Sequence, residues 1–195
     1  MLFGKTPYSV LVVSSGEKIT EFIKEVLDNS VYSPVVFTAS GGEARNILIS
    51  QNFDLVIINS PLSDEFGSEL AFKLTENSVC GVIILVKSDI FDEISERVEQ
   101  YGVLAVSKPI SRAFFTQAIK MSVATLERLK RLETENKKLT LKIDEVKLIE
   151  RAKFVLIEYL KMNESQAHKY IEKQAMDMRV TRREVAESII KTYEY

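Results

Sequence analysis

The chemically informative residues begin with Asn59, which closes the apolar run 53–59 (FDLVIIN) just before Pro61. This run is short and rich in β-branched residues, as is typical of a buried parallel strand. Such a strand delivers its last residue to the crevice where open α/β sheets bind ligands. An Asp there could be phosphorylated, but a carboxamide is a poor nucleophile and has no charge to hold Mg²⁺. We therefore expect a scaffold that has lost this chemistry.

Other chemical groups are sparse in the chain. It contains one histidine, His168, and one cysteine, Cys80, so neither a histidine metal site nor an internal disulfide is available. We expect His168 at the surface and Cys80 in the core, with no nucleophile–base set, metal or cofactor. These absences argue against an enzyme. No apolar run approaches the ~20 residues of a membrane helix, and no signal-peptide pattern opens the chain, so we expect a cytoplasmic protein without membrane contact.

Charge is divided unevenly along the chain. Residues 1–119 carry 9 Lys and Arg against 15 Asp and Glu, whereas residues 120–195 carry 17 against 13. An acidic front and a mildly basic back indicate different partners for the two halves.

The first half alternates between the two secondary-structure signals. We predict strands at 9–15, 35–39, 53–59, 82–86 and 103–107, separated by helices at 17–29, 41–52, 68–76 and 90–101. Alternating elements of this kind indicate an α/β fold with a doubly wound, five-stranded parallel sheet.

Residues 8–120 resemble the receiver domain of two-component response regulators. The spacing from Asp54 through Pro61 to Gly67 aligns the third strand and its turn without gaps. The resemblance implies an acidic pair after the first strand, a phosphorylated Asp after the third and Thr or Ser ending the fourth. It also implies Lys-Pro after the fifth. In this chain the corresponding residues form a degenerate phosphorylation site: Ser14, Ser15, Asn59, Val86 and Lys108, of which only Lys108 with Pro109 matches.

This pattern predicts a pseudo-receiver that is not phosphorylated, with a partner protein or small ligand regulating it instead. Asp64, in the loop beyond Asn59, is a weak substitute for the missing carboxylates. Lys108 is either a turn lysine or a hydrogen-bond donor to Asn59, and the sequence does not separate the two. The peptide bond before Pro109 is a candidate for the cis form.

A long helix is predicted from residue 111, because no Gly or Pro follows Pro109. Its apolar residues repeat at alternating intervals of three and four. This heptad pattern, with a polar Asn at one a position, favours a parallel two-stranded coiled coil over an amphipathic helix packed on its own domain. The predicted dimer seam comprises Leu129, Leu132, Asn136, Leu139, Ile143 and Val146.

Two further helix starts follow. Asn163 precedes Gln166 by three positions, and Thr181 precedes Glu184 by three, which is the capping-box spacing. With the end of the long helix they predict a small three-helix module, which we expect to depend on the dimer for stability.

Residues 148–192 resemble the ANTAR domain, an RNA-binding module of transcription antiterminators. The matching positions are Ala152-Lys153, the segment 163–167 (NESQA), Ala175-Met176 with Arg179, and the segment 184–186 (EVA). The resemblance implies binding to an RNA stem-loop in a nascent transcript, which prevents a terminator hairpin. A receiver, a coiled coil and this module in sequence is the layout of that family.

Several side chains of the module suit contact with RNA. Basic residues meet phosphates, and an amide reads unpaired base edges. Tyr170 is either a stacking residue or part of the core, with the core favoured, and Glu172 stands where the family often has a basic residue. The predicted RNA-binding residues are Lys153, Lys169, Lys173, Gln174, Arg179, Arg182 and Arg183.

Together these patterns predict a pseudo-receiver domain at 1–120, a coiled-coil linker at 121–147 and an ANTAR-like domain at 148–195. The expected function is a dimeric RNA-binding antiterminator regulated independently of phosphorylation. Two alternatives stay open. One is a helix-turn-helix DNA-binding regulator, with Arg182 and Arg183 at the start of its recognition helix. The other is a protein-binding scaffold without catalysis.

Overall fold

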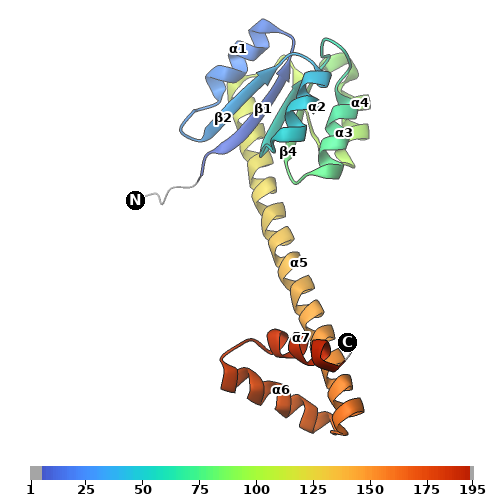
Figure 1. Cartoon of the computed structure of the whole chain (residues 1–195). Coiled ribbons are helices and arrows are strands. Elements are labelled where there is room, and N and C mark those ends of the chain that lie inside the picture. Colours follow the sequence, from blue (N-terminus) through green and yellow to red (C-terminus); the bar gives the residue numbers. More distant parts are fainter. Residues whose placement is uncertain (1–5, 194–195) are drawn as a thin grey trace. The chain divides into compact units, whose positions relative to one another are not determined.

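The computed structural model describes residues 6–193 and divides into two compact units, with the boundary after Arg131. The first unit contains a five-stranded sheet in the order β2-β1-β3-β4-β5, with every strand pair parallel (Figure 1). This confirms the predicted fold class. The strands are β1 (Tyr8–Ser14), β2 (Tyr32–Thr38), β3 (Leu55–Asn59), β4 (Gly81–Lys87) and β5 (Leu104–Lys108).

Helices connect the strands as a parallel sheet requires, because each crossover must return the chain to the same edge. They are α1 (Glu17–Val26), α2 (Gly41–Ser50), α3 (Ser68–Asn77) and α4 (Phe91–Glu99), the last preceded by the 3₁₀ turn Ser88–Ile90. Strand β2 begins three residues before the predicted start at residue 35 and includes Pro34. An edge strand tolerates proline, and β2 lies at the edge of this sheet.

The two faces of the sheet bury separate apolar clusters. Along β1, Leu11 and Val13 join the cluster on one face, and Val10 and Val12 join the cluster on the other. Every residue of β3 is buried, as expected for a strand in the middle of a covered sheet. The strand's last residue, Asn59, therefore reaches the crevice at the carboxyl edge with little freedom to move.

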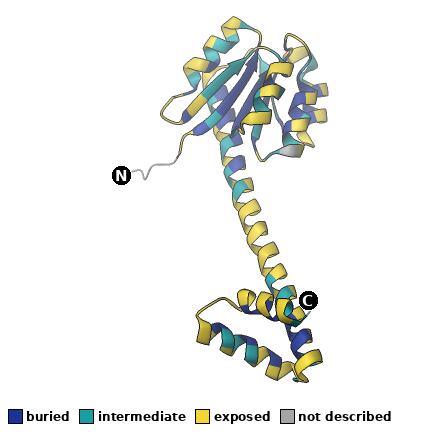
Figure 2. Cartoon of the chain, in the orientation of Figure 1, coloured by how far each residue is buried: buried dark blue, intermediate teal, exposed yellow. Residues whose placement is uncertain are grey.

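Helix α5 (Arg112–Leu160) is continuous over 49 residues. Its first turns belong to the receiver-like unit, where Phe115, Ile119 and Leu126 are buried against the sheet. The receiver-like unit therefore reaches further along the helix than the predicted boundary at residue 120, because these side chains complete its core. Exposed residues predominate along the middle of α5 (Figure 2).

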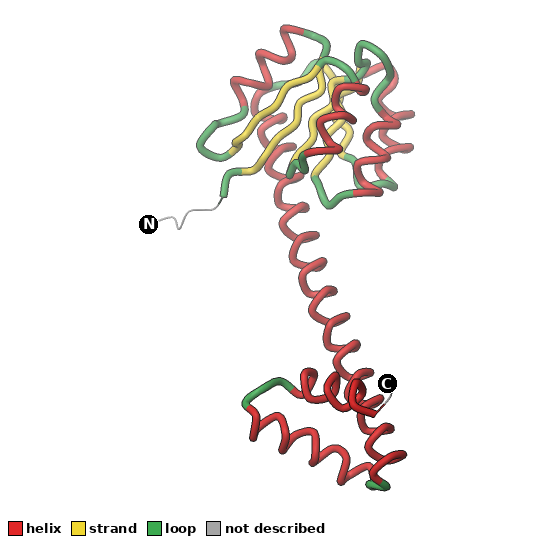
Figure 3. Tube along the Cα trace, viewed as in Figure 1, coloured by secondary structure: helices red, strands yellow, loops and turns green. Residues whose placement is uncertain are grey.

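The second unit packs the end of α5 against α6 (Glu164–Met178) and α7 (Arg182–Tyr193), as the tube of Figure 3 shows. Both predicted capping boxes form. Asn163 and Gln166 exchange two hydrogen bonds of 2.9 Å at the start of α6. Thr181 and Glu184 exchange bonds of 2.7 and 3.2 Å before α7.

The core of this unit draws on all three helices. Its buried residues are Ala152, Val155, Leu156, Ala167, Ile171, Ala175, Val185, Ala186 and Ile189. Among the described helices, none combines the length and apolar character needed to cross a membrane.

Candidate functional site

The crevice of the receiver-like unit contains a closed hydrogen-bond chain centred on Asn59. Lys108 Nζ donates to Asn59 Oδ1 at 2.8 Å and to the Ser60 carbonyl at 2.6 Å. Asn59 Nδ2 donates to Ser14 Oγ at 3.1 Å, and the Thr20 hydroxyl lies 2.9 Å from the same oxygen. Lys108 is therefore a partner of Asn59, and neutral oxygens and an amide occupy the place of the family's carboxylates.

The predicted degenerate phosphorylation site also includes Ser15 and Val86. Ser14 and Val86 are buried, and Ser15 is exposed with its hydroxyl 3.4 Å from the Pro61 carbonyl. Burial, with the neighbouring charge of Lys87, lowers the pKa of Lys108. The Lys108–Pro109 peptide bond is cis.

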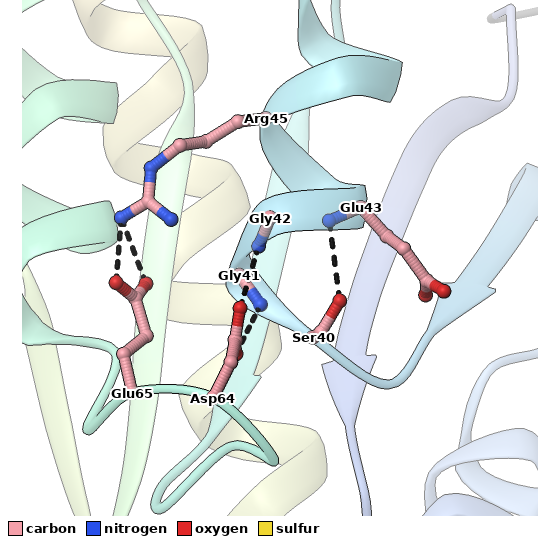
Figure 4. Close-up of polar contacts among 7 residues, drawn as sticks. All are labelled: Ser40, Gly41, Gly42, Glu43, Arg45, Asp64 and Glu65. Atoms are coloured by element: carbon pink, nitrogen blue, oxygen red, sulfur yellow. Dashed lines mark hydrogen bonds and ion pairs between the residues drawn. The ribbon is translucent and has the colours of Figure 1, made fainter.

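Asp64, the nearest loop carboxylate, is engaged elsewhere. Its two oxygens accept hydrogen bonds of 2.8 and 2.9 Å from the backbone amides of Gly41 and Gly42, at the start of α2 (Figure 4). These bonds lower the pKa of Asp64, with the Gly41 amide contributing most. A carboxylate at a helix N-terminus also interacts favourably with the helix dipole.

An ion pair also holds the same loop. Arg45 Nη2 lies 2.8 and 2.7 Å from the two oxygens of Glu65, so the loop between β3 and α3 is attached to α2 at two adjacent points (Figure 4). A Cβ at Gly41 would lie only 2.2 Å from Glu65 Oε1. Glycine at 41 therefore leaves room for the Glu65 carboxylate, a role that the sequence analysis missed.

The opposite end of β3 is joined to helix α5. Asp54 Oδ2 accepts hydrogen bonds from the backbone and hydroxyl of Ser9, and Asp54 Oδ1 forms an ion pair with Lys130. Burial alone would raise the pKa of Asp54, but the contacts with Lys130 and Ser9 outweigh it and lower the pKa. Nearby, the Tyr8 hydroxyl donates to Glu127 at 2.9 Å. These contacts were also missed, because their partners lie far apart in sequence.

The predicted seam residues lie on the exposed part of α5. The apolar members are between 45% and 59% exposed, and Asn136 is also exposed. Large apolar side chains at this exposure, spaced by three and four residues, leave a continuous apolar stripe on the single chain.

The predicted RNA-binding cations fall into two groups. Lys153 is buried, and its Nζ lies 2.8 Å from Glu150 and 3.1 Å from Glu164, contacts that raise its pKa. Arg182 lies 3.7 Å from Glu172, and Arg183 lies 2.9 Å from Glu187. These three cations are thus already near carboxylates of their own unit.

The second group comprises Lys169, Lys173 and Arg179. All three are exposed, and none forms an ion pair with another residue of the described range 6–193. Arg179 caps the C-terminus of α6 in the left-handed conformation, with φ of 56°. Among the predicted RNA-binding cations, those without an ion pair therefore lie on α6 and at its C-terminal end.

The remaining candidates on α6 are less exposed. Gln174 is half-buried, and Tyr170 packs against the core of the unit, as the favoured alternative had it. Glu172 Oε1 lies 3.3 Å from Nε2 of His168, which is exposed as predicted. Glu172 thus lies near both His168 of α6 and Arg182 of α7.

The second unit is similar to a known domain family. Residues 137–190 match the family model of the ANTAR domain. Over 187 residues the chain is 29% identical to the transcriptional regulatory protein PdtaR of Mycobacterium tuberculosis, covering 95% of this chain and 91% of that protein.

Solved structures assign the fold of the first unit. A response regulator receiver domain protein from Clostridium thermocellum matches with a TM-score of 0.55 and 20% identity over 63% of this chain and 98% of that one. Full-length FixJ from B. japonicum matches with a TM-score of 0.57 and 12% identity, covering 96% of this chain and 97% of that one. The chain thus joins a domain of receiver fold to a C-terminal ANTAR domain and is homologous to PdtaR.

Proposed function

We propose that this protein is a dimeric RNA-binding antiterminator whose receiver domain acts without phosphorylation. The observation that carries the proposal is the exposed positive charge of α6 within the ANTAR domain. Lys169 and Lys173 are one helical turn apart, so they can contact successive phosphates of one strand. Arg179 adds a third cation at the end of the same helix.

The crevice supports the second part of the proposal. The resemblance implies that a receiver accepts phosphate on a carboxylate and that its Mg²⁺ is held by anionic oxygens, but Asn59 and Ser14 offer no carboxylate. Lys108 donates to Asn59, and Asp64 is held at the start of α2. Regulation through this domain is therefore expected from a partner protein or small ligand.

The apolar stripe of α5 supports dimerisation. Its residues repeat with heptad spacing, and Asn136 at an a position favours a parallel two-stranded register. A second copy in register would cover the exposed leucines, and two ANTAR domains would then be joined in one particle. RNA with two stem-loops should consequently bind more tightly than RNA with one, through raised effective concentration.

A DNA-binding helix-turn-helix remains the second candidate, because Arg182 and Arg183 lie at the start of α7, where base-reading residues are usually found. Each of these arginines has a glutamate within 3.7 Å, however, and this lowers the charge they present to a phosphate backbone. The predicted cations without such a neighbour, Lys169, Lys173 and Arg179, lie on α6 and at its C-cap instead.

A salt series separates the two candidates. Binding of the full-length protein to hairpin RNA, unstructured RNA and duplex DNA should show preference for the hairpin. Lys173→Ala should weaken hairpin binding and reduce the logarithmic salt slope by about 0.7–0.9. Lys18→Ala, an exposed cation of the receiver-like unit and outside the matched range 137–190, is the control and should leave binding unchanged. Equal affinity for duplex DNA, or an unchanged slope for Lys173→Ala, would contradict the RNA function.

A further inference from the structure

The outer face of α6 contains a methionine among its cations. Met176 is 72% exposed, the highest value for any large apolar side chain of the ANTAR domain within the described residues. It follows Lys173 by three positions and Lys169 by seven, so the three side chains share one face. Ala167, Ile171 and Ala175 are buried on the opposite face. Packing within the single chain therefore does not account for an apolar residue at position 176.

The neighbouring charges indicate what covers this side chain. Lys169 and Lys173 form no ion pair with the other described residues, and both lie on the N-terminal side of Met176, so the occupant should supply anions beside an apolar contact. An unpaired nucleotide of an RNA loop has this chemistry, since its phosphates are anionic and the face of its base is apolar. A thioether is polarisable and contacts aromatic rings favourably.

We infer that Met176 forms the surface against which an unpaired loop base packs, while Lys169 and Lys173 hold phosphates on one side of that base. This inference rests on the proposed RNA function and adds a residue that recognises the loop rather than the backbone. Contact with a base face tolerates several bases, so Met176 should favour loops with an extruded base over loops whose bases all stay stacked.

The test uses the full-length protein and RNA hairpins that share one stem and have randomised loops. A bound loop is enriched from this pool and then remade with a single abasic nucleotide at each loop position in turn. Met176→Ala should weaken binding of the intact loop by about three- to tenfold. At one loop position, the abasic RNA should bind the wild type and Met176→Ala with equal affinity. The missing base already abolishes the contact that the substitution would remove.

Two variants control for the fold and for the residue type. Met178→Ala removes a methionine that is 54% exposed on the same helix, two positions away and hence on a different face, and should not change binding. Met176→Leu keeps an apolar surface and should retain most of the affinity. Circular dichroism establishes that each variant is folded.

Three results would overturn the inference. If Lys173→Ala weakens binding but Met176→Ala does not, the phosphate contacts stand and the base contact fails. If the losses from Met176→Ala and from every abasic position simply add, the methionine touches no loop base. If Met176→Ala instead changes the sedimentation of the protein without RNA, its partner is protein. By contrast, if neither substitution affects RNA, the proposed function itself fails.

Discussion

Lys108 donates a 2.8 Å hydrogen bond to the side-chain oxygen of Asn59, and both residues stand at strand ends in the crevice. The bond joins β3 to β5, which are not neighbours in the sheet because β4 lies between them. A cation, an amide and a serine hydroxyl thus satisfy one another where the receiver family is expected to need negative charge. Together these contacts link the carboxyl ends of β1, β3 and β5.

This organisation predicts that Lys108→Ala destabilises the receiver-like unit. The substitution leaves the buried Asn59 oxygen without its donor, which should cost about 1–3 kcal/mol of unfolding free energy. Lys87→Ala removes an exposed neighbouring lysine and should be neutral or slightly stabilising, because the charge of Lys87 lowers the pKa of Lys108. Urea unfolding of both variants measures the difference, and equal midpoints would contradict the role of Lys108.

The protein should not accept phosphate from small donors. Incubation with acetyl phosphate and Mg²⁺, followed by intact-mass measurement, should show no added phosphoryl group, since Asn59 is not a nucleophile and Asp64 is bonded to two amides. A phosphorylatable receiver treated in parallel is the positive control. An alkali-labile adduct on the wild type that is absent from Asp64→Ala would identify Asp64 as an acceptor and refute the prediction.

The bonds of Asp64 predict a pH-dependent contribution to stability. The folded-state pKa of this carboxylate is lowered, so its contribution is complete above the unfolded-state pKa, about 3.9, and is lost as the pH falls through the folded-state value. In thermal unfolding, the melting temperature of the wild type should therefore be higher than that of Asp64→Ala near neutral pH, and this difference should disappear in acid. Asp89→Ala, another exposed carboxylate of the same unit, should show no comparable gap. A difference in melting temperature that stays constant with pH would contradict a stabilising contact between the ionised Asp64 carboxylate and the start of α2.

The apolar stripe of α5 predicts a dimer that one charge can break. Leu139→Lys should yield monomers, because the charge would have to be buried in the seam. Leu141→Lys is the matched control, since Leu141 is 58% exposed, against 59% for Leu139, but falls outside the heptad seam. Light scattering should measure the molar mass of each protein. A monomeric wild type, or the same change in molar mass for both substitutions, would contradict the parallel coiled coil.

Features with local causes were predictable from the sequence. Strand β3 was expected from its β-branched residues, and the helix starts at Asn163 and Thr181 from cap residues only three positions apart. The seam residues are exposed on one chain as their spacing implies, although the dimer itself stays a prediction. Local patterns suffice in these cases because the interacting groups lie within one or two turns of each other.

Features that depend on distant partners could not be predicted. Lys153 was assigned to RNA as a surface cation, but Glu164 approaches it from the next helix and leaves it buried. Contact between Lys153 and an RNA phosphate stays a prediction, and the ion pairs of Lys153 favour an indirect role in RNA binding. Asp64 and Gly41 are 23 positions apart, so neither position alone indicates that a loop carboxylate caps α2.

The contact between Asp54 and Lys130 has a consequence for the order in which the domain is completed during synthesis. The two residues are 76 positions apart, and Leu126, almost wholly buried in the receiver core, lies just before Lys130. A nascent chain that has emerged only to residue 120 contains every strand but lacks Leu126, Glu127 and Lys130. Because contacts of such separation form late and slowly, the receiver should finish folding only when this stretch of α5 has left the ribosome. A receiver fragment that ends at residue 120 would lack part of its own apolar core.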